Sequence, residues 1–90
     1  MRFEWDPRKA AANLRKHGMS FEEATTAPRD ALAITGRDPD HSSDESRYIT
    51  FGVSSQRSLL VVAHTDRGRL IRIISACTAT KSERKTYEEG

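Results

Sequence analysis

This sequence has little cysteine, no long apolar run and no apolar N-terminal segment. A single cysteine, Cys77, stands among 90 residues, which excludes an internal disulfide and any cysteine-based metal site. No apolar run approaches the roughly 18 residues that a membrane-spanning helix needs, and the N-terminus has no apolar signal region. We therefore expect a cytoplasmic protein without a membrane segment. Repeats and low-complexity stretches are also missing, so one small domain over residues 1–90 is predicted.

The charge is nearly balanced in total but uneven along the chain. Fifteen Lys and Arg residues stand against 13 Asp and Glu residues, which gives a net charge of +2. Acids gather between Glu22 and Glu45, whereas cations dominate from Arg57 until the last few residues. This distribution is compatible with a polyanion-binding surface, although a solvated charged face is the simpler interpretation.

The first 18 residues predict a short strand followed by a helix. Residues 1–5 are the strand candidate, with two aromatic side chains on one face. Asp6 is a good N-cap, Pro7 suits the first helical position, and Gly18 suits the position after the last. The helix is therefore expected to end in a turn that contains Lys16 and His17.

A second, short helix and a brief strand are expected next. Ser20 and Glu23 have the spacing of a capping box, and Pro28 should end this helix near Thr26. Residues 30–36 then read as a brief strand closed by a glycine.

The remaining chain predicts three strands and a closing helix. The strands are expected at 47–54, 58–65 and 70–77, and the joins are short enough for antiparallel hairpins. A second capping box starts the last helix, which should reach about Glu88. The predicted order β-α-α-β-β-β-β-α is an α+β fold, with two N-terminal helices, an antiparallel meander of about four strands and a C-terminal helix. We expect the helices on one face of the sheet and an open second face.

The polar segment 37–46 contains several potential metal ligands, namely Asp38, Asp40, His41, Asp44 and Glu45. Their spacing matches no ordered ligand loop, since an EF-hand needs glycine at its sixth position and glutamate at its twelfth. We interpret the segment as a solvated loop and predict no metal site and no cofactor.

Three separated motifs resemble the BrnT family of toxins. They are "FEWDPRKAAANLRKHGMSFEEA" (residues 3–24), "ESRYITFG" (45–52) and "IRIISACTATKSERKTYEE" (71–89). The resemblance implies a RelE-like fold and a ribonuclease toxin of a type II toxin–antitoxin system, which inhibits translation. It also implies a cognate BrnA antitoxin, a small ribbon-helix-helix protein. Operator DNA would then be contacted only through the antitoxin complex.

Cys77 departs from the family pattern, which has arginine after the Ser-Ala pair. The sequence near this cysteine shows no arrangement of cysteine, histidine and acid that would suit nucleophilic catalysis. We therefore interpret Cys77 as a replacement for that arginine and not as a nucleophile. Partial burial as a small apolar residue is expected. The substitution would attenuate the toxin, and its origin, natural or selected during cloning, is left open.

Metal-independent RNA cleavage by the ribose 2′-OH needs a base, an acid and cations that stabilise the phosphoryl oxygens. The cationic candidates are Arg47, Arg72 and Arg84. Tyr87 lies on the same helix face as Arg84 and could stack a base or bind phosphate, or else pack on the sheet. Arg72 could instead lie on the solvent face or pair with an acid.

The proton-transfer candidates are His64, which is our first choice, and the pair Lys16/His17. A histidine at this position is more often a helix-terminal cap than a catalyst, so His17 could instead be a cap. Two rival functions stay open: a catalytically silent co-repressor that binds the antitoxin, and a small structural interaction domain. A neighbouring reading frame for a ribbon-helix-helix protein would favour either toxin-related interpretation.

Overall fold

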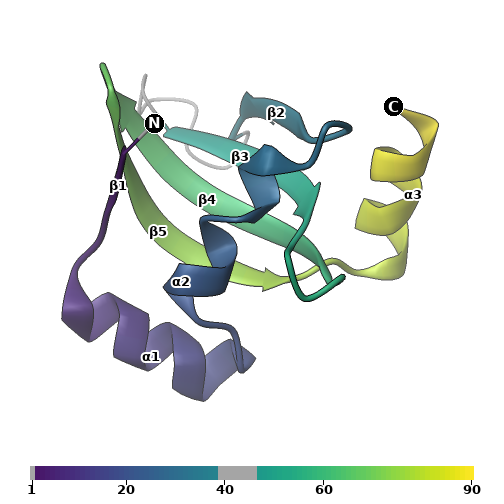
Figure 1. Ribbon diagram of the computed structural model, residues 1–90. Helices are drawn as coiled ribbons and strands as arrows, with labels where there is room; N and C mark the ends of the chain where they lie inside the picture. The colour runs from purple at the N-terminus through teal and green to yellow at the C-terminus, as the bar shows by residue number, and fades with distance from the viewer. Residues whose placement is uncertain (1, 39–46) are drawn as a thin grey trace.

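The computed structural model describes residues 2–38 and 47–90, and it has the predicted α+β architecture (Figure 1). The elements are, in chain order, β1 (Arg2–Glu4), α1 (Pro7–His17), α2 (Phe21–Ala24), the 3₁₀-helix η1 (Ala27–Arg29), β2 (Ile34–Arg37), β3 (Arg47–Val53), β4 (Leu59–Arg67), β5 (Leu70–Thr78) and α3 (Lys81–Glu89). None of the helices in this described part is long and apolar enough to cross a membrane.

The five strands form one sheet in the order β1-β5-β4-β3-β2. Strands β2 to β5 are the predicted antiparallel meander. The sequence did not predict that β1 joins the sheet next to β5 and runs parallel to it, with Phe3 opposite Ile71. The sheet is therefore mixed. No hairpin connects the first strand to the last, so turn chemistry carries no information about this pairing.

Local capping chemistry sets the helix ends where the sequence predicts them. The Asp6 carboxylate accepts a hydrogen bond from the Arg8 amide at 2.8 Å, and Gly18 adopts a left-handed conformation with φ 66°. The Ser20 hydroxyl accepts from the Glu23 amide at 3.1 Å. The second helix is shorter than predicted, because α2 ends at Ala24 and a separate 3₁₀ turn follows.

The hydrophobic core lies between one face of the sheet and the helices α1, α2 and η1. The largest of its fully buried members are Phe21, Leu60, Val62 and Ile73. Gly52 allows η1 to approach β3 closely, since a Cβ atom there would lie 2.3 Å from the carbonyl oxygen of Ala27. The 3₁₀-helix therefore packs directly against β3.

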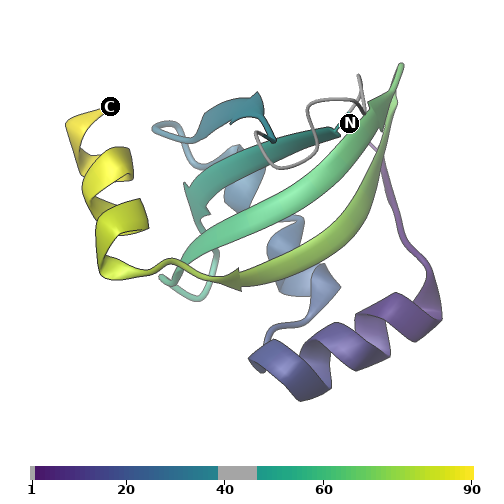
Figure 2. The same cartoon turned by 180° about the vertical axis from the view of Figure 1, so that it is seen from behind.

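The C-terminal helix does not join this helical layer, contrary to the prediction that all helices pack on one face. Helix α3 has no buried residue and stands at the end of the sheet away from β1 (Figures 1 and 2). Its sequence KSERKTYEE offers no apolar stripe that could be buried. The capping box is present, with Thr80 and Glu83 exchanging hydrogen bonds of 2.8 and 3.2 Å.

Candidate functional site

The second face of the sheet is the candidate functional surface. Figure 2 shows that no helix of residues 2–38 and 47–90 lies across it. By register, Phe51, Val61 and Cys77 form one cross-strand row on this face. Ile49 and Ser75 lie in the next row and are half-buried, as is Phe51. The sequence predicted an open face, and this face carries apolar side chains at its centre.

A charged row borders the apolar centre. Arg47 and Arg72 both lie opposite Thr65, so two strand spacings, about 10 Å, separate them. The Arg47 Nε atom lies 3.2 Å from the carboxylate of Asp38, and an Arg72 guanidinium nitrogen lies 3.2 Å from that of Glu4. The sequence had left pairing with an acid open for Arg72. Because the Arg72–Glu4 pair is about one-third exposed on both sides, it is weak and can open toward a ligand.

A bulge in β5 places Arg72 and Cys77 on the same face. The partners of Ala63 and His64 are Ser75 and Ile73, so Ile74 is an extra, unpaired residue. Without it, two residues that are five apart on a strand would point to opposite faces. The two side chains are nevertheless about 15 Å apart along β5. They do not surround one phosphate.

Cys77 is a half-buried thiol on this face, near the C-terminal end of β5. Burial raises the pKa of the Cys77 thiol, and the carboxylate of Glu83 on α3 raises it further. A raised pKa keeps sulfur protonated at neutral pH, which disfavours a nucleophilic role. A longer side chain at this position would project over the open face beside Phe51 and Val61.

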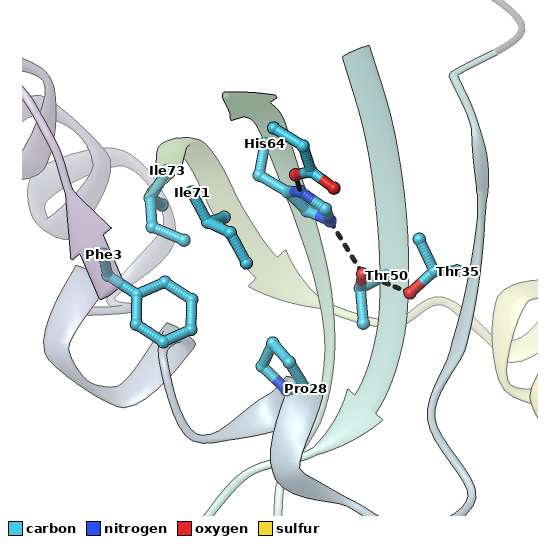
Figure 3. A pocket seen from close by; sticks show the side chains of 8 residues that line it. Phe3, Pro28, Thr35, Thr50, His64, Ile71 and Ile73 are labelled. Carbon is cyan, nitrogen blue, oxygen red and sulfur yellow. Dashed lines mark hydrogen bonds and ion pairs between the residues drawn. The ribbon is translucent and has the colours of Figure 1, made fainter. Parts of the chain in front are cut away.

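His64 lies on the opposite face, against the helical layer. It is 4% exposed, and its ring bonds Asp66 at 2.7 Å through Nδ1 and Thr50 at 2.8 Å through Nε2 (Figure 3). The chain of hydrogen bonds continues from Thr50 to Thr35 at 2.7 Å. These groups line a pocket of about 200 Å³, whose apolar walls are Phe3, Pro28, Ile71 and Ile73. The sheet therefore separates His64 from both arginines of the charged row.

Helix α3 is attached through Asp30, a residue that the sequence reading had not singled out. The Tyr87 hydroxyl donates to the Asp30 carboxylate at 2.5 Å, and the amides of Val53 and Leu32 donate to it as well. The sequence signal that could have identified Asp30 is its place in a turn. Aspartate in a turn often accepts a hydrogen bond from the backbone amide two residues later. Arg84, on the same helix, is exposed.

The Asp30 carboxylate should make the attachment of α3 sensitive to acid. The Tyr87 hydroxyl lowers the pKa of Asp30 most, followed by the amides of Val53 and Leu32. A carboxylate with a depressed folded-state pKa stabilises the fold above its unfolded pKa, and this stabilisation is lost as the pH falls through the folded-state pKa. We expect protection of the α3 amides from hydrogen exchange to stay constant from about pH 5 to 7 and to fall below about pH 4.

The matched variant is Tyr87→Phe, which removes the donor and keeps the ring. Its α3 amides should be less protected at neutral pH and less sensitive to acid. Equal protection in the two proteins at every pH would show that this hydrogen bond does not hold the helix.

Lys16 and His17 lie elsewhere, at the outer edge of β5. Both are exposed, and both line a groove together with Lys9, Ile74 and Ser75. The groove exists because Asn13, 6% exposed, ties α1 to β5, with its amide bonded to both the N–H and the C=O of Ala76. Neither the role of Asn13 nor this groove was predicted from the sequence.

The potential metal ligands of the acidic segment fall mainly outside the described residues. Four of the five lie outside the described part of the chain, namely Asp40, His41, Asp44 and Glu45. The fifth, Asp38, accepts a hydrogen bond from Arg47. Within residues 2–38 and 47–90, no three His, Cys, Asp or Glu side chains gather in a way that could hold a metal ion.

Comparison with known proteins identifies the family. The family model described as "Ribonuclease toxin, BrnT, of type II toxin-antitoxin system" matches residues 5–83. This chain belongs to the BrnT family. Its members are ribonuclease toxins that work with an antitoxin, so RNA and an antitoxin are the partners that the family implies. The matched range includes position 77 and ends before Arg84 and Tyr87.

The fold of the family is present as well. The crystal structure of the Brucella abortus ribonuclease toxin BrnT superposes with a TM-score of 0.71 at 20% sequence identity. The match covers 90% of this chain and 99% of the Brucella chain. A search of curated protein sequences gives no match.

Proposed function

We propose that this BrnT-family chain is an endoribonuclease that cleaves RNA on the open face of its sheet without a metal ion. The observation that carries the proposal is that Arg47, Arg72 and position 77, where the family pattern has arginine, share the sheet face that no helix of the described residues covers. Guanidinium groups suit this role because each can bond two phosphoryl oxygens at once.

The cations are proposed to bind successive phosphates of one RNA strand. Arg72 and position 77 are about 15 Å apart along β5, which is too far for a shared phosphate. We place the scissile phosphate near position 77, with Arg47 and Arg72 on the phosphates toward one end of the sheet. Arg84 and Tyr87, on α3, would contact the strand at the other end. Tyr87 does so through its ring, because its hydroxyl is bonded to Asp30.

The proton-transfer role is reassigned from His64 to His17. His64 is buried on the other face, and both of its ring nitrogens are already hydrogen-bonded. His17 is exposed in the groove that Ser75 also lines, and Ser75 is two residues from Cys77 on the same face. An exposed imidazole can accept and donate protons, which suits it to acid–base work. His17 would take the proton of the 2′-OH as this oxygen attacks phosphorus. The bond from phosphorus to the 5′ oxygen would break, the 5′ oxygen would take a proton from water, and a 2′,3′-cyclic phosphate would form.

The antitoxin is proposed to be a BrnA-like ribbon-helix-helix protein that neutralises the toxin in the cytoplasm. Support comes from the family, which belongs to a type II toxin–antitoxin system. The half-buried side chains of Ile49 and Phe51 give the open face an apolar centre that such a partner could cover. Operator DNA would be contacted only through that complex.

A second function is favoured by one observation, the cysteine at position 77. With a thiol of raised pKa in place of an arginine, the chain has no permanent charge at the proposed scissile position. In that case it would be a catalytically silent co-repressor, which binds the antitoxin but does not cut RNA.

RNA cleavage in EDTA distinguishes the two functions. The purified chain should release fragments with 2′,3′-cyclic phosphate ends, and addition of the antitoxin should stop the release. Cleavage that requires added Mg²⁺ would contradict the metal-independent mechanism. Tight antitoxin binding without any cleavage, including cleavage on ribosomes, would favour the co-repressor.

A further inference from the structure

We infer that helix α1 is a second RNA-binding surface, which holds the backbone of the substrate strand beyond the cleavage site. The inference rests on the proposed function for the identity of the ligand. It concerns residues that the proposed chemistry does not use: Arg8, Lys9 and Arg15, together with Lys16. These four side chains form the α1 basic surface.

The composition of α1 is one-sided. Its 11 residues, PRKAAANLRKH, contain these four permanent cations and no acid. All four side chains are exposed. No ion pair joins any of them to another of the described residues. A solvated helix commonly pairs its cations with acids three or four positions away, and α1 does not.

Helix stability does not explain the charges in the first turn. Arg15 and Lys16 lie in the last turn, where cations interact favourably with the helix dipole. Arg8 and Lys9 lie in the first turn, where the dipole favours anions and repels cations. Two cations at the unfavourable end point to a ligand that carries negative charge.

The spacing and shape of the surface suit an extended polyanion. Lys9 and Lys16 are seven residues apart, hence on one helix face and about 10.5 Å from each other along the axis. Ala12 lies between them, and its small side chain lets a backbone approach closely. Together with Ile74 and Ser75, they line a groove of about 220 Å³.

The groove continues the proposed cleavage face. In both views α1 lies beyond the β5 edge of the sheet (Figures 1 and 2). Ser75 lines the groove, and by register it also belongs to the open face, beside Ala63. An RNA strand that crosses position 77 can therefore pass over Ser75 onto α1. This continuity favours RNA over an acidic protein segment as the occupant.

The test measures binding of 2′-O-methyl RNA, which cannot be cleaved because it lacks the attacking hydroxyl. Fluorescence anisotropy would be recorded against salt concentration for strands of about 4 and about 16 nucleotides. For Lys9→Gln/Lys16→Gln, we expect a weaker salt dependence on the long strand. The negative slope of the log association constant against log salt concentration should become less steep by roughly 1.4, at about 0.7 for each lost phosphate contact. At about 50 mM salt, affinity for this strand should fall tenfold or more. Binding of the short strand should stay nearly unchanged.

Two further variants make the result specific. Lys9→Arg/Lys16→Arg keeps both charges and should bind like the parent protein. Arg67→Gln/Arg69→Gln removes two exposed charges from the β4–β5 turn and should change the slope much less. Equal losses from the α1 and turn variants would overturn the inference, since the effect would then follow from net charge alone. The inference would also be overturned if the α1 variant bound RNA normally but bound the antitoxin more weakly.

Failure of the inference and failure of the proposed function can be told apart. If RNA is cleaved but long-strand binding does not depend on Lys9 and Lys16, the α1 basic surface is wrong and the ribonuclease stands. If the salt slope depends on both lysines but no RNA is cleaved, the surface stands and the ribonuclease assignment fails.

Discussion

Cys77→Arg should raise the rate of RNA cleavage by about two orders of magnitude or more. A preorganised donor to a phosphoryl or carbonyl oxyanion is typically worth 10²–10³ in kcat, and a guanidinium offers two such donors. Position 77 is on the open face, in one row with Phe51 and Val61, so an arginine there points toward the proposed strand. Glu83, which lies close enough to raise the pKa of the Cys77 thiol, would help to orient the guanidinium.

The measurement is the single-turnover cleavage rate in EDTA at equal protein concentration, with variants that separate charge from shape. Cys77→Lys supplies one point charge and should recover only part of the rate. Cys77→Ser supplies no charge and should leave the rate unchanged. An equal gain from the serine and arginine variants would show that removal of the thiol, and not a cation, is what matters.

The Cys77→Arg protein also tests which histidine transfers the proton. In the Cys77→Arg protein, His17→Gln should remove most of the gained activity and alter the pH profile. His64→Gln should act mainly on stability, because it disrupts the bonds to Thr50 and Asp66 in a buried site. The reverse pattern would return the proton-transfer role to His64.

Elements governed by neighbouring residues could be predicted from the sequence. Asp6 and Gly18 bound α1, and Thr80 with Glu83 starts α3, because capping is a matter of side chains within three residues of each other. The β3–β4 and β4–β5 hairpins were predicted for the same reason. The parallel pairing of β1 with β5 joins segments nearly 70 residues apart, and no local signal encodes it.

The composition of the site could be predicted only in part, because it depends on which face each strand presents. Arg72 and Cys77 share a face only because of the bulge at Ile74. The alternation of apolar and polar residues does not reveal one extra residue in a strand. His64 was the first choice for proton transfer, yet it lies on the buried face of the sheet. Asp30 and Asn13 were missed because their partners, Tyr87 and Ala76, are 57 and 63 residues away.

Asn13→Ala should be the most damaging single change to stability among those considered, at about 3 kcal/mol. The Asn13 side chain donates to the carbonyls of Met19 and Ala76 at 2.9 and 2.8 Å, and it accepts from the Ala76 amide at 3.1 Å. Alanine would leave three backbone groups unpaired, where Met19 is 5% and Ala76 0% exposed. Each buried unsatisfied group costs about 1–3 kcal/mol. The gain in helix propensity, about 0.5 kcal/mol, offsets little of this.

Urea unfolding followed by tryptophan fluorescence measures the effect, since Trp5 packs edge-to-face on the buried ring of Phe21 at 6.0 Å. Leu14→Ala is the matched control, because it truncates the next residue of the same helix at a side chain that is 52% exposed. It should change stability by no more than about 0.5 kcal/mol. Similar small losses for both variants would mean that water replaces the Asn13 amide at the β5 edge. A large loss confined to Asn13→Ala would show that this amide holds α1, and with it the α1 basic surface, against the edge of the sheet.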